Sequence, residues 1–173
     1  LGGGWTDAVL FVESWRAAMA GDRDRLLGVA DLAEALAPSR ERHLETMAQG
    51  TAFLAGVCIW PCRPVEDLCD LTRGRAAYPV AVAAAAAGHG IPIEDALPLH
   101  LNAFAANLIS VAVRLVPLGQ TAGLSVLAGL QPLLLDVSRR AGRTTLDDLG
   151  SSAIISDIAA MRHEQQYSRT FRT

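Results

Sequence analysis

The sequence predicts an all-α fold, a single-domain helical bundle, from three observations. Alanine and leucine are the most frequent residues, and aromatic side chains make up only 5% of the chain. β-Branched residues come singly rather than in alternating runs, which favours helices over a sheet. A chain of 173 residues can bury one full hydrophobic core and is short for two ordinary domains. We therefore expect one domain over residues 1–173.

Three helices are predicted before the first cysteine. The first runs from Trp5 to Met19, with apolar residues at helical spacing. Asp22 is placed to cap the second, which ends before Pro38 because the residue that precedes a proline disfavours the helical conformation. Ser39 then restarts the chain as the cap of the third helix.

The middle of the chain alternates irregular and regular segments. Residues 58–74 hold two prolines and end at a glycine, so we expect a loop that can include one short helix. The alanine-rich run from Tyr78 to Ala87 predicts a helix whose small side chains let a neighbouring helix approach closely.

The longest predicted helix runs from about Pro92 to Val116 and carries two unlike sides. Its broad side is apolar and holds Leu101, Phe104, Leu108, Val111 and Leu115. Its narrower side is polar and holds His100, Asn107, Ser110 and Arg114. We expect a central helix whose polar side either faces water or is shared with another molecule.

A tight turn at 117–119 predicts that the next helix, which runs to about Arg140, packs antiparallel to the longest one. We expect its core-facing residues to be Leu124, Leu127, Leu130, Leu134 and Val137. A final helix carries the apolar residues Ile154, Ile155, Ile158 and Met161.

Charge and cysteine usage exclude several classes of protein. The net charge of -3 is small and mixed along the chain, so we expect no nucleic-acid partner. The three cysteines are odd in number, form no disulfide framework and fit a reducing cytoplasm. The start of the chain has no secretory signal. Since the first residue is not Met, we expect the natural N-terminus to be missing.

Residues 115–135 carry no charged side chain, and they are one candidate for a membrane-spanning helix. About 20 apolar residues are enough to span a bilayer. Two prolines and two glutamines in that stretch make a poor lipid-facing helix, so we expect burial in the bundle instead.

No catalytic or metal site is predicted. The spacing of Cys58, Cys62 and Cys69 matches no standard zinc module, and the four histidines include no pair four residues apart. The segment GQTAG at 119–123 lacks the lysine of a phosphate-binding loop, and the whole chain contains no lysine. Gln120 and Thr121 there are expected to begin a helix, with backbone N–H groups free for a cap or a partner's carboxylate. We predict a protein that is not an enzyme.

The C-terminal segment MRHEQQYSRTFRT begins like a zinc-protease helix, but Tyr167 stands where the second histidine is needed. On an unbroken helix, Tyr167 and Phe171 would lie on a different face from the apolar residues of the last helix. The segment therefore either leaves the helix and folds back, stays a frayed end, or presents Tyr167, Phe171 and nearby arginines to another molecule.

Two stretches closely resemble the UreF family of urease accessory proteins. They are HGIPIEDALPLHLNAFAANLISVAVRLVPLGQTAG (89–123) and DDLGSSAIISDIAAMRHEQQYSRTFR (147–172). A third stretch, SRERHLETMAQGTAFL (39–54), resembles the family more weakly. The VPLGQT turn and the terminal MRHEQQYSRTFR are its most specific motifs. Family members usually begin with a segment ahead of the first helix, and the present chain starts beyond it.

The resemblance implies an all-helical cytoplasmic protein that forms a homodimer and helps insert nickel into apo-urease. It implies a scaffold or checkpoint that links UreD, also called UreH, to the GTPase UreG, with no cofactor bound directly and the nickel handled by the complex. It also implies that residues 162–173 dock on UreD. The expected partner-binding residues are Arg162, His163, Glu164, Gln166, Tyr167, Arg169, Phe171 and Arg172, with Gln120 and Thr121.

The alternative function is a GTPase-activating regulator of UreG. In that case Arg162 or Arg114 acts in trans on the γ-phosphate of the GTPase partner as an arginine finger.

Overall fold

The computed structural model describes residues 2–116, 118–150 and 153–167. It confirms the all-α prediction, because the described residues form eight α-helices and one short 3-10 helix, with no strand among them. The elements are α1 (Gly3–Ala20), α2 (Arg23–Ala35), α3 (Arg40–Val57), α4 (Arg63–Thr72), α5 (Tyr78–Gly88), α6 (Ile93–Leu115), α7 (Gln120–Ala141), η1 (Leu146–Asp148) and α8 (Ile154–Glu164).

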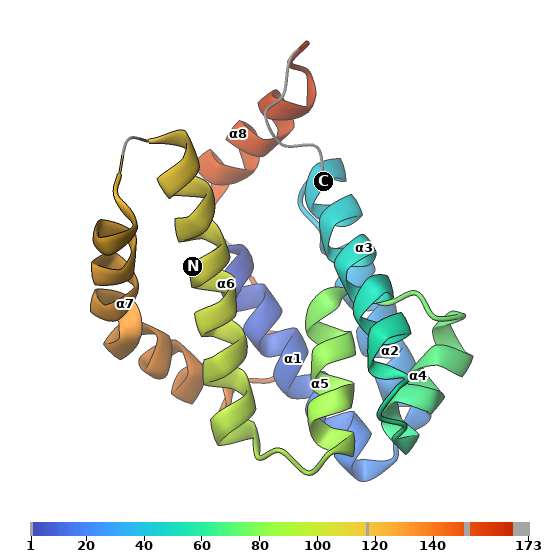
Figure 1. Cartoon of the computed structure of the whole chain (residues 1–173). Coiled ribbons are helices and arrows are strands. Elements are labelled where there is room, and N and C mark those ends of the chain that lie inside the picture. The colour runs from blue at the N-terminus through green and yellow to red at the C-terminus, as the bar shows by residue number, and fades with distance from the viewer. Residues whose placement is uncertain (1, 117, 151–152, 168–173) are drawn as a thin grey trace.

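The alanine-rich helix α5 lies at the centre of the bundle, next to α1. In Figure 1 these two helices separate the α6–α7 pair from α2, α3 and α4. Ala81, Ala83 and Ala84 are fully buried, which confirms that the small side chains of this run face close neighbours. The approach is tight where α3 meets the start of α5: a Cβ added at Gly50 would lie 2.0 Å from the carbonyl oxygen of Ala76.

The buried apolar residues form two clusters that both use α1 and α5. One cluster packs α1 and α5 against α2, α3 and α4 through residues such as Leu26, Leu54 and Leu68. The other packs α1 and α5 against α6 through residues such as Phe11 and Leu97. The core therefore sits between the two halves of the molecule and leaves the outer sides of α6, α7 and α8 to be covered by something else or by water.

Local capping follows the sequence. The side chain of Asp22 accepts a hydrogen bond from the N–H of Arg25, and that of Ser39 accepts one from the N–H of Arg42. Both predicted caps are confirmed. The irregular segment at 58–74 includes α4, the short helix that the sequence allowed, with Pro64 in its first turn, where a missing N–H costs nothing.

A buried carboxylate joins α1 to α2 and to the end of α7. Glu13 is only 3% exposed and accepts hydrogen bonds from Arg16 at 2.6 Å and from Arg25 at 2.5 Å. Arg16 also donates to the carbonyl oxygens of Gly142 and Thr144. This network ties the far end of the α6–α7 pair to the first helix.

The prediction that α7 turns five apolar residues toward the core is confirmed at Leu134 and Val137, which pack against the second cluster, and is wrong at Leu124, which is 66% exposed. Leu127 and Leu130 are half-buried. The fully buried residues of α7 are Gly123, Ser138 and Ala141. On α6, Leu108 and Leu115 are also more than half exposed. The charge-free stretch 115–135 is divided between two helices, because α6 ends at Leu115 and α7 begins at Gln120, on either side of the turn predicted at 117–119. Pro117 of that turn lies outside the described residues. By length and composition alone, α6 and α7 could each cross a membrane, a property that core helices of soluble proteins share.

Candidate partner-docking site

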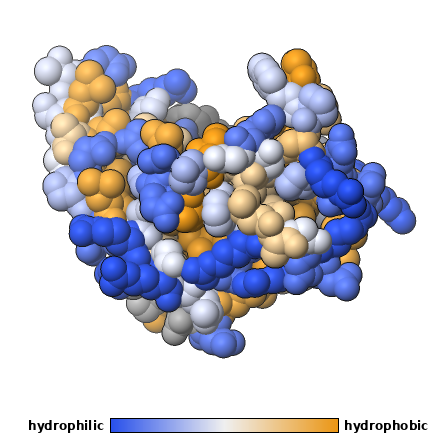
Figure 2. Space-filling model, turned by 90° about the horizontal axis from the view of Figure 1, so that it is seen from below, coloured by the Kyte–Doolittle hydropathy of each residue, from blue (hydrophilic) through white to orange (hydrophobic). Residues whose placement is uncertain are grey.

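A groove of about 960 Å³ opens between α3 and the α6–α7 pair. In Figure 2 the molecule is hollowed between two lobes, and hydrophobic side chains line the hollow. The apolar wall of the groove includes Phe53, Phe104, Leu108, Leu133, Leu134 and Val137, and its polar rim includes Asp7, Arg42, Glu45 and Gln49. Ala160 of α8 also lines the groove.

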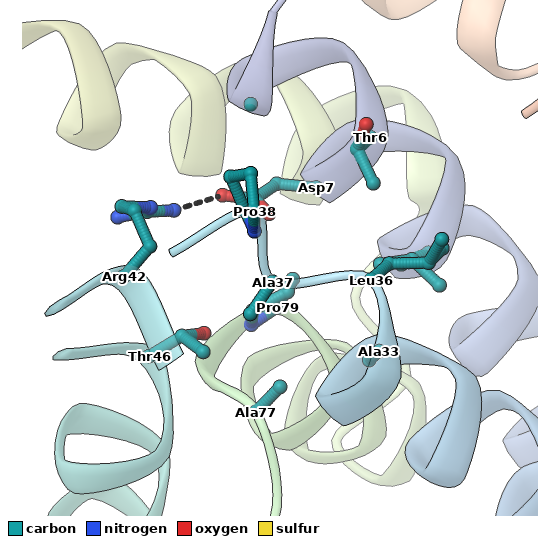
Figure 3. Close-up of a pocket in the computed structure, with 12 residues that line it drawn as sticks. Thr6, Asp7, Ala33, Leu36, Ala37, Pro38, Arg42, Thr46, Ala77 and Pro79 are labelled. Carbon is teal, nitrogen blue, oxygen red and sulfur yellow. Dashed lines mark hydrogen bonds and ion pairs between the residues drawn. The ribbon is translucent and has the colours of Figure 1, made fainter. Parts of the chain in front are cut away.

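Arg42 organises the polar rim. Its guanidinium lies 2.6 Å from Glu45 and 3.2 Å from Asp7, so that α3 and α1 are joined at the edge of the groove. Figure 3 shows Arg42 and Asp7 pointing toward one another beside a small pocket of about 60 Å³. Burial raises the pKa of Asp7 to about 6, although the charge of Arg42 acts in the opposite direction.

His100 lies in the floor of the groove and does not belong to an exposed polar face. It is 7% exposed, and its ring centroid lies 4.9 Å from that of Phe11 and 5.7 Å from that of Tyr78. Burial lowers its pKa to about 4, so the imidazole is neutral at pH 7 and packs as an aromatic ring. The prediction that His100 shares a polar face is therefore corrected. The other members of that face, Asn107, Ser110 and Arg114, are exposed.

The last helix presents its apolar side chains to solvent. Ile154, Ile155, Ile158 and Met161 are 65%, 85%, 41% and 47% exposed. Ile154, Ile158 and Met161 follow one another at helical spacing, so they form one stripe, to which Ile155 is adjacent. We call these four residues the α8 stripe. The sequence suggested a core for this stripe, and within the described residues no core covers it.

A hydrogen bond between side chains joins α8 to α3. The Nδ1 atom of His163 lies 2.7 Å from Oε2 of Glu41, and both side chains are partly exposed. Arg162, in the last turn of α8, and Gln166, beyond its end, are exposed. Tyr167 is fully exposed. The side chain of Glu164 and the predicted docking residues Arg169, Phe171 and Arg172 lie outside the described residues.

Gln120 and Thr121 begin α7, as the sequence predicts, and both are exposed. Gly119 precedes them and makes no side-chain cap, so the first N–H groups of the helix have no capping side chain. Figure 1 places this turn and α8 at the same end of the molecule. The structure thus brings Gln120, Thr121 and the described docking residues of 162–167 to one end.

Two parts of this site were missed from the sequence. The residues of the α8 stripe have the spacing of an apolar helix face. Such spacing predicts that the face is covered, but it does not distinguish a core of the same chain from a partner protein. The groove comes from the angle between α3 and the α6–α7 pair, for which a sequence has no local signal. Among the described residues, no group of three or more His, Cys, Asp or Glu side chains could hold a metal ion.

The comparisons with known proteins agree on one family. Residues 1–131 match UreF. A urease accessory protein UreF of Mesorhizobium japonicum is 54% identical over 174 residues, which cover 100% of this chain and 75% of that relative. Proteins of the same name from Brucella ovis and Rhizobium leguminosarum bv. trifolii are 49% and 50% identical, over 99% and 98% of this chain and 73% of each relative.

Proposed function

Because this chain belongs to the UreF family of urease accessory proteins, we propose that it is a non-catalytic scaffold for the insertion of nickel into apo-urease. In this proposal it acts in the cytoplasm as a checkpoint that joins UreD (UreH) to the GTPase UreG. The nickel is handled by the complex and is not bound by this chain alone. The family membership supports a role in urease maturation, and the exposed α8 stripe supports a role as a binding partner.

We place the UreD contact on α8 and the segment that follows it, residues 162–173. A stripe of four exposed apolar residues followed by a fully exposed tyrosine is costly to leave in water and is typical of a surface that a partner covers. Tyrosine and arginine are the residues that most often anchor protein interfaces, which favours Tyr167 and Arg162 as central contacts.

Size-exclusion chromatography with light scattering on this chain mixed with UreD tests the contact. We expect truncation after Met161 to abolish the complex and Tyr167→Ala to weaken it at least about tenfold, the effect of a modest interface anchor. Met19→Ala is a matched control, because Met19 is also an exposed apolar residue, 54% exposed, but lies on α1. Unchanged binding by the truncated chain would remove this docking site from the proposal.

The second proposed contact is a homodimer through the outer side of α6 and α7. Exposed apolar residues of α6 and α7 that do not line the groove include Leu99, Leu115, Leu124, Val126 and Leu135. At its two ends α6 carries opposite charges, with Glu94 and Asp95 in the first turn and Arg114 in the last. Two copies of α6 that pack antiparallel about a two-fold axis would place Arg114 of one beside the acidic turn of the other, a self-complementary arrangement.

Charge reversal tests the dimer without disturbing the core. We expect Arg114→Glu to weaken the dimer, and the double variant Asp95→Arg with Arg114→Glu to restore it, since both charges are then exchanged. Leu99→Glu should give a monomer. If the chain instead floats with liposomes, the apolar side of α6 and α7 faces a membrane and the dimer assignment is wrong. A mass by light scattering that is the same for Leu99→Glu and wild type also contradicts the dimer assignment.

A second candidate function is favoured by the exposure of Arg114 and Arg162. Either guanidinium could reach the γ-phosphate of UreG and accelerate GTP hydrolysis, as arginine fingers do by about 10³- to 10⁵-fold. The rate of GTP turnover by UreG in the presence of UreD, measured with and without this chain, distinguishes the arginine finger from the scaffold. Turnover that does not rise excludes the arginine finger and leaves the scaffold.

A further inference from the structure

The imidazole of His100 is a buried polar group without a hydrogen-bond partner. The side chain is 7% exposed and lies between the rings of Phe11 and Tyr78, and neither of its ring nitrogens is hydrogen-bonded to any residue that the structure describes. A neutral imidazole has one N–H donor and one acceptor nitrogen. Nearly all buried polar groups in proteins are hydrogen-bonded, so an unpaired one indicates a bound ligand or a water molecule.

His100 lines the groove between α3 and the α6–α7 pair, whose volume is about 960 Å³. Several other polar groups of the lining already have partners within the chain. Arg42 contacts Glu45 and Asp7, and the hydroxyl of Thr46 accepts a backbone N–H. Binding sites typically combine apolar walls with a few polar groups that fix the orientation of what is bound. The groove therefore has the composition of a binding site with one hydrogen-bonding position in its floor.

The small number of free polar groups indicates the conformation of the occupant. An extended peptide presents an N–H and a C=O at each residue, and in an apolar groove most of these groups would lose their hydrogen bonds to water without replacement. A helix pairs its own backbone groups and uses the groove only for its side chains. The walls are themselves helices, with Phe53 on α3, Phe104 on α6 and Leu133 on α7, so side chains of a further helix can pack between them.

The charges on the rim add an electrostatic preference. On the α3 side, Arg42 is shared by two carboxylates, those of Asp7 and Glu45, so this edge carries excess negative charge. Among the described lining residues, those of α6 and α7 include no Asp, Glu, Lys or Arg. A helix that matches the groove therefore carries Lys or Arg on one edge only. Toward His100 it carries an uncharged hydroxyl or amide, because these groups can pair with a neutral imidazole.

We propose that this groove binds an amphipathic helix of a partner protein. Its apolar side chains lie between α3 and the α6–α7 pair, its basic side chains lie along the α3 rim, and a hydroxyl or amide group is hydrogen-bonded to His100. Because Ala160 of α8 also lines the groove, the groove is continuous with the contact proposed for α8. The inference rests on the proposed scaffold role and adds to it a second binding element and the chemistry of its ligand.

Photo-crosslinking on the full-length protein tests the groove. Benzoylphenylalanine replaces Gln49, an exposed residue of the lining, and in the matched control it replaces Asp31, an exposed residue of α2 outside the groove. Each protein is irradiated with purified UreD, UreG and apo-urease, singly and together, and the crosslinked peptide is identified by mass spectrometry. We expect the probe at Gln49, and not the probe at Asp31, to mark a partner segment with apolar residues at helical spacing and a basic edge.

Two pairs of variants measure the contacts in the groove. Leu133→Glu places a charge in the apolar wall and should abolish the crosslink from position 49, whereas Leu44→Glu, at a similarly exposed residue of α3 outside the groove, should not. His100→Phe keeps an aromatic ring but leaves the polar group of the partner unpaired, so affinity for the crosslinked partner should fall about tenfold in calorimetric titration. His89→Phe makes the same exchange at an exposed histidine and should bind as wild type. Circular dichroism confirms that each variant is folded.

Nuclear magnetic resonance of the histidine side chains distinguishes a hydrogen bond from a packing effect. On addition of the partner, the ¹⁵N signals of the His100 imidazole should shift, and those of His89 should not. Signals that stay in place, together with wild-type affinity of His100→Phe, would mean that water alone pairs with the ring, and this result would overturn the proposal.

The crosslinks themselves can also contradict the proposal. Crosslinks from position 49 to a second copy, or to another part of the same chain, would mean that this protein covers its own groove. A partner segment without an apolar helical face would exclude the helix. A complex with UreD that forms without any crosslink from position 49 would remove the groove and leave the scaffold role, whereas the absence of a complex with all three proteins would remove both.

Discussion

The Nδ1 atom of His163 lies 2.7 Å from Oε2 of Glu41, and this contact fastens α8 to α3. The apolar stripe of α8 is only partly covered, because Ile154 and Ile155 are 65% and 85% exposed and Ile158 and Met161 are 41% and 47% exposed. A helix held by few buried contacts opens at low free-energy cost, as segments that bind partners commonly do. We therefore expect the contact between His163 and Glu41 to contribute to the placement of α8 on α3.

His163→Ala should loosen α8 without destabilising the bundle. A partly exposed ion pair contributes at most about 1 kcal/mol, so the free energy of unfolding should change little, while hydrogen exchange across 154–164 should become faster. His43→Ala is the matched control, since it removes a similar pair, His43 to Glu34 at 3.0 Å, between α3 and α2. Equal exchange of α8 in both variants would mean that other contacts hold it.

Gly50→Ala should destabilise the fold by at least about 2 kcal/mol, because the new methyl group meets backbone atoms that cannot move aside. The added Cβ would lie 2.0 Å from the carbonyl oxygen of Ala76 and 2.8 Å from the nitrogen of Tyr78. Gly56 lies in the same helix with nothing within 4 Å of such a Cβ, so Gly56→Ala should stabilise by up to about 1 kcal/mol. Urea denaturation measures both; similar values would contradict the close approach of α3 and α5.

Glu13→Ala should cost about 2 to 3 kcal/mol of unfolding free energy. The substitution removes a buried carboxylate from two arginines, and breaking a buried ion pair is expensive because one charge loses its partner. The arginines reach water, which keeps the cost below that of a fully buried pair. Asp136→Ala is the control, as its contacts with Arg139 and Arg140 at 3.8 and 3.9 Å are exposed and should contribute under about 0.5 kcal/mol. An equal loss in the two variants would show that burial of Glu13 has no effect.

The parts of the fold that depend on local signals were predictable from the sequence. Asp22 and Ser39 cap helices because their side chains reach N–H groups three residues ahead, a relation within one turn of chain. The alanine run between Tyr78 and Ala87 could be predicted to be a close-packed helix, because alanine favours helices and its small side chain lets a neighbouring helix approach closely. Such features involve neighbours in sequence, so a pattern is sufficient to find them.

The parts that depend on what covers a face were not predictable. His100 was assigned to a polar side by its position on the helix, but its ring is buried between Phe11 and Tyr78, which belong to other helices. The α8 stripe has the periodicity of a core face and is exposed. In both cases the group that determines whether the side chain is buried lies far away in sequence or on another molecule. The helical spacing of the residues does not identify that group.

Asp7 and His100 both line the groove, and their titrations oppose each other. The folded protein raises the pKa of Asp7 from 3.8 to about 6, so this group contributes stability that is full below pH 3.8 and lost as the pH rises through 6. It lowers the pKa of His100 from 6.5 to about 4, so this group contributes stability that is present above pH 6.5 and lost as the pH falls through 4. The two windows nearly coincide, and the two slopes have opposite signs.

Removing one of the two groups should therefore reveal the slope of the other. Between pH 4 and 6.5, His100→Phe should lose stability relative to wild type as the pH rises, and Asp7→Asn should gain it, each by about 2 to 3 kcal/mol across the window, because one pKa unit corresponds to about 1.4 kcal/mol. Phenylalanine keeps an aromatic ring beside Phe11, and asparagine keeps a polar group beside Arg42. Urea denaturation followed by circular dichroism at several pH values measures the slopes, with His89→Asn, which removes an exposed imidazole, as the control expected to follow wild type. Parallel pH profiles for wild type and His100→Phe would mean that the imidazole is solvated in the folded state and that the floor of the groove is open to water.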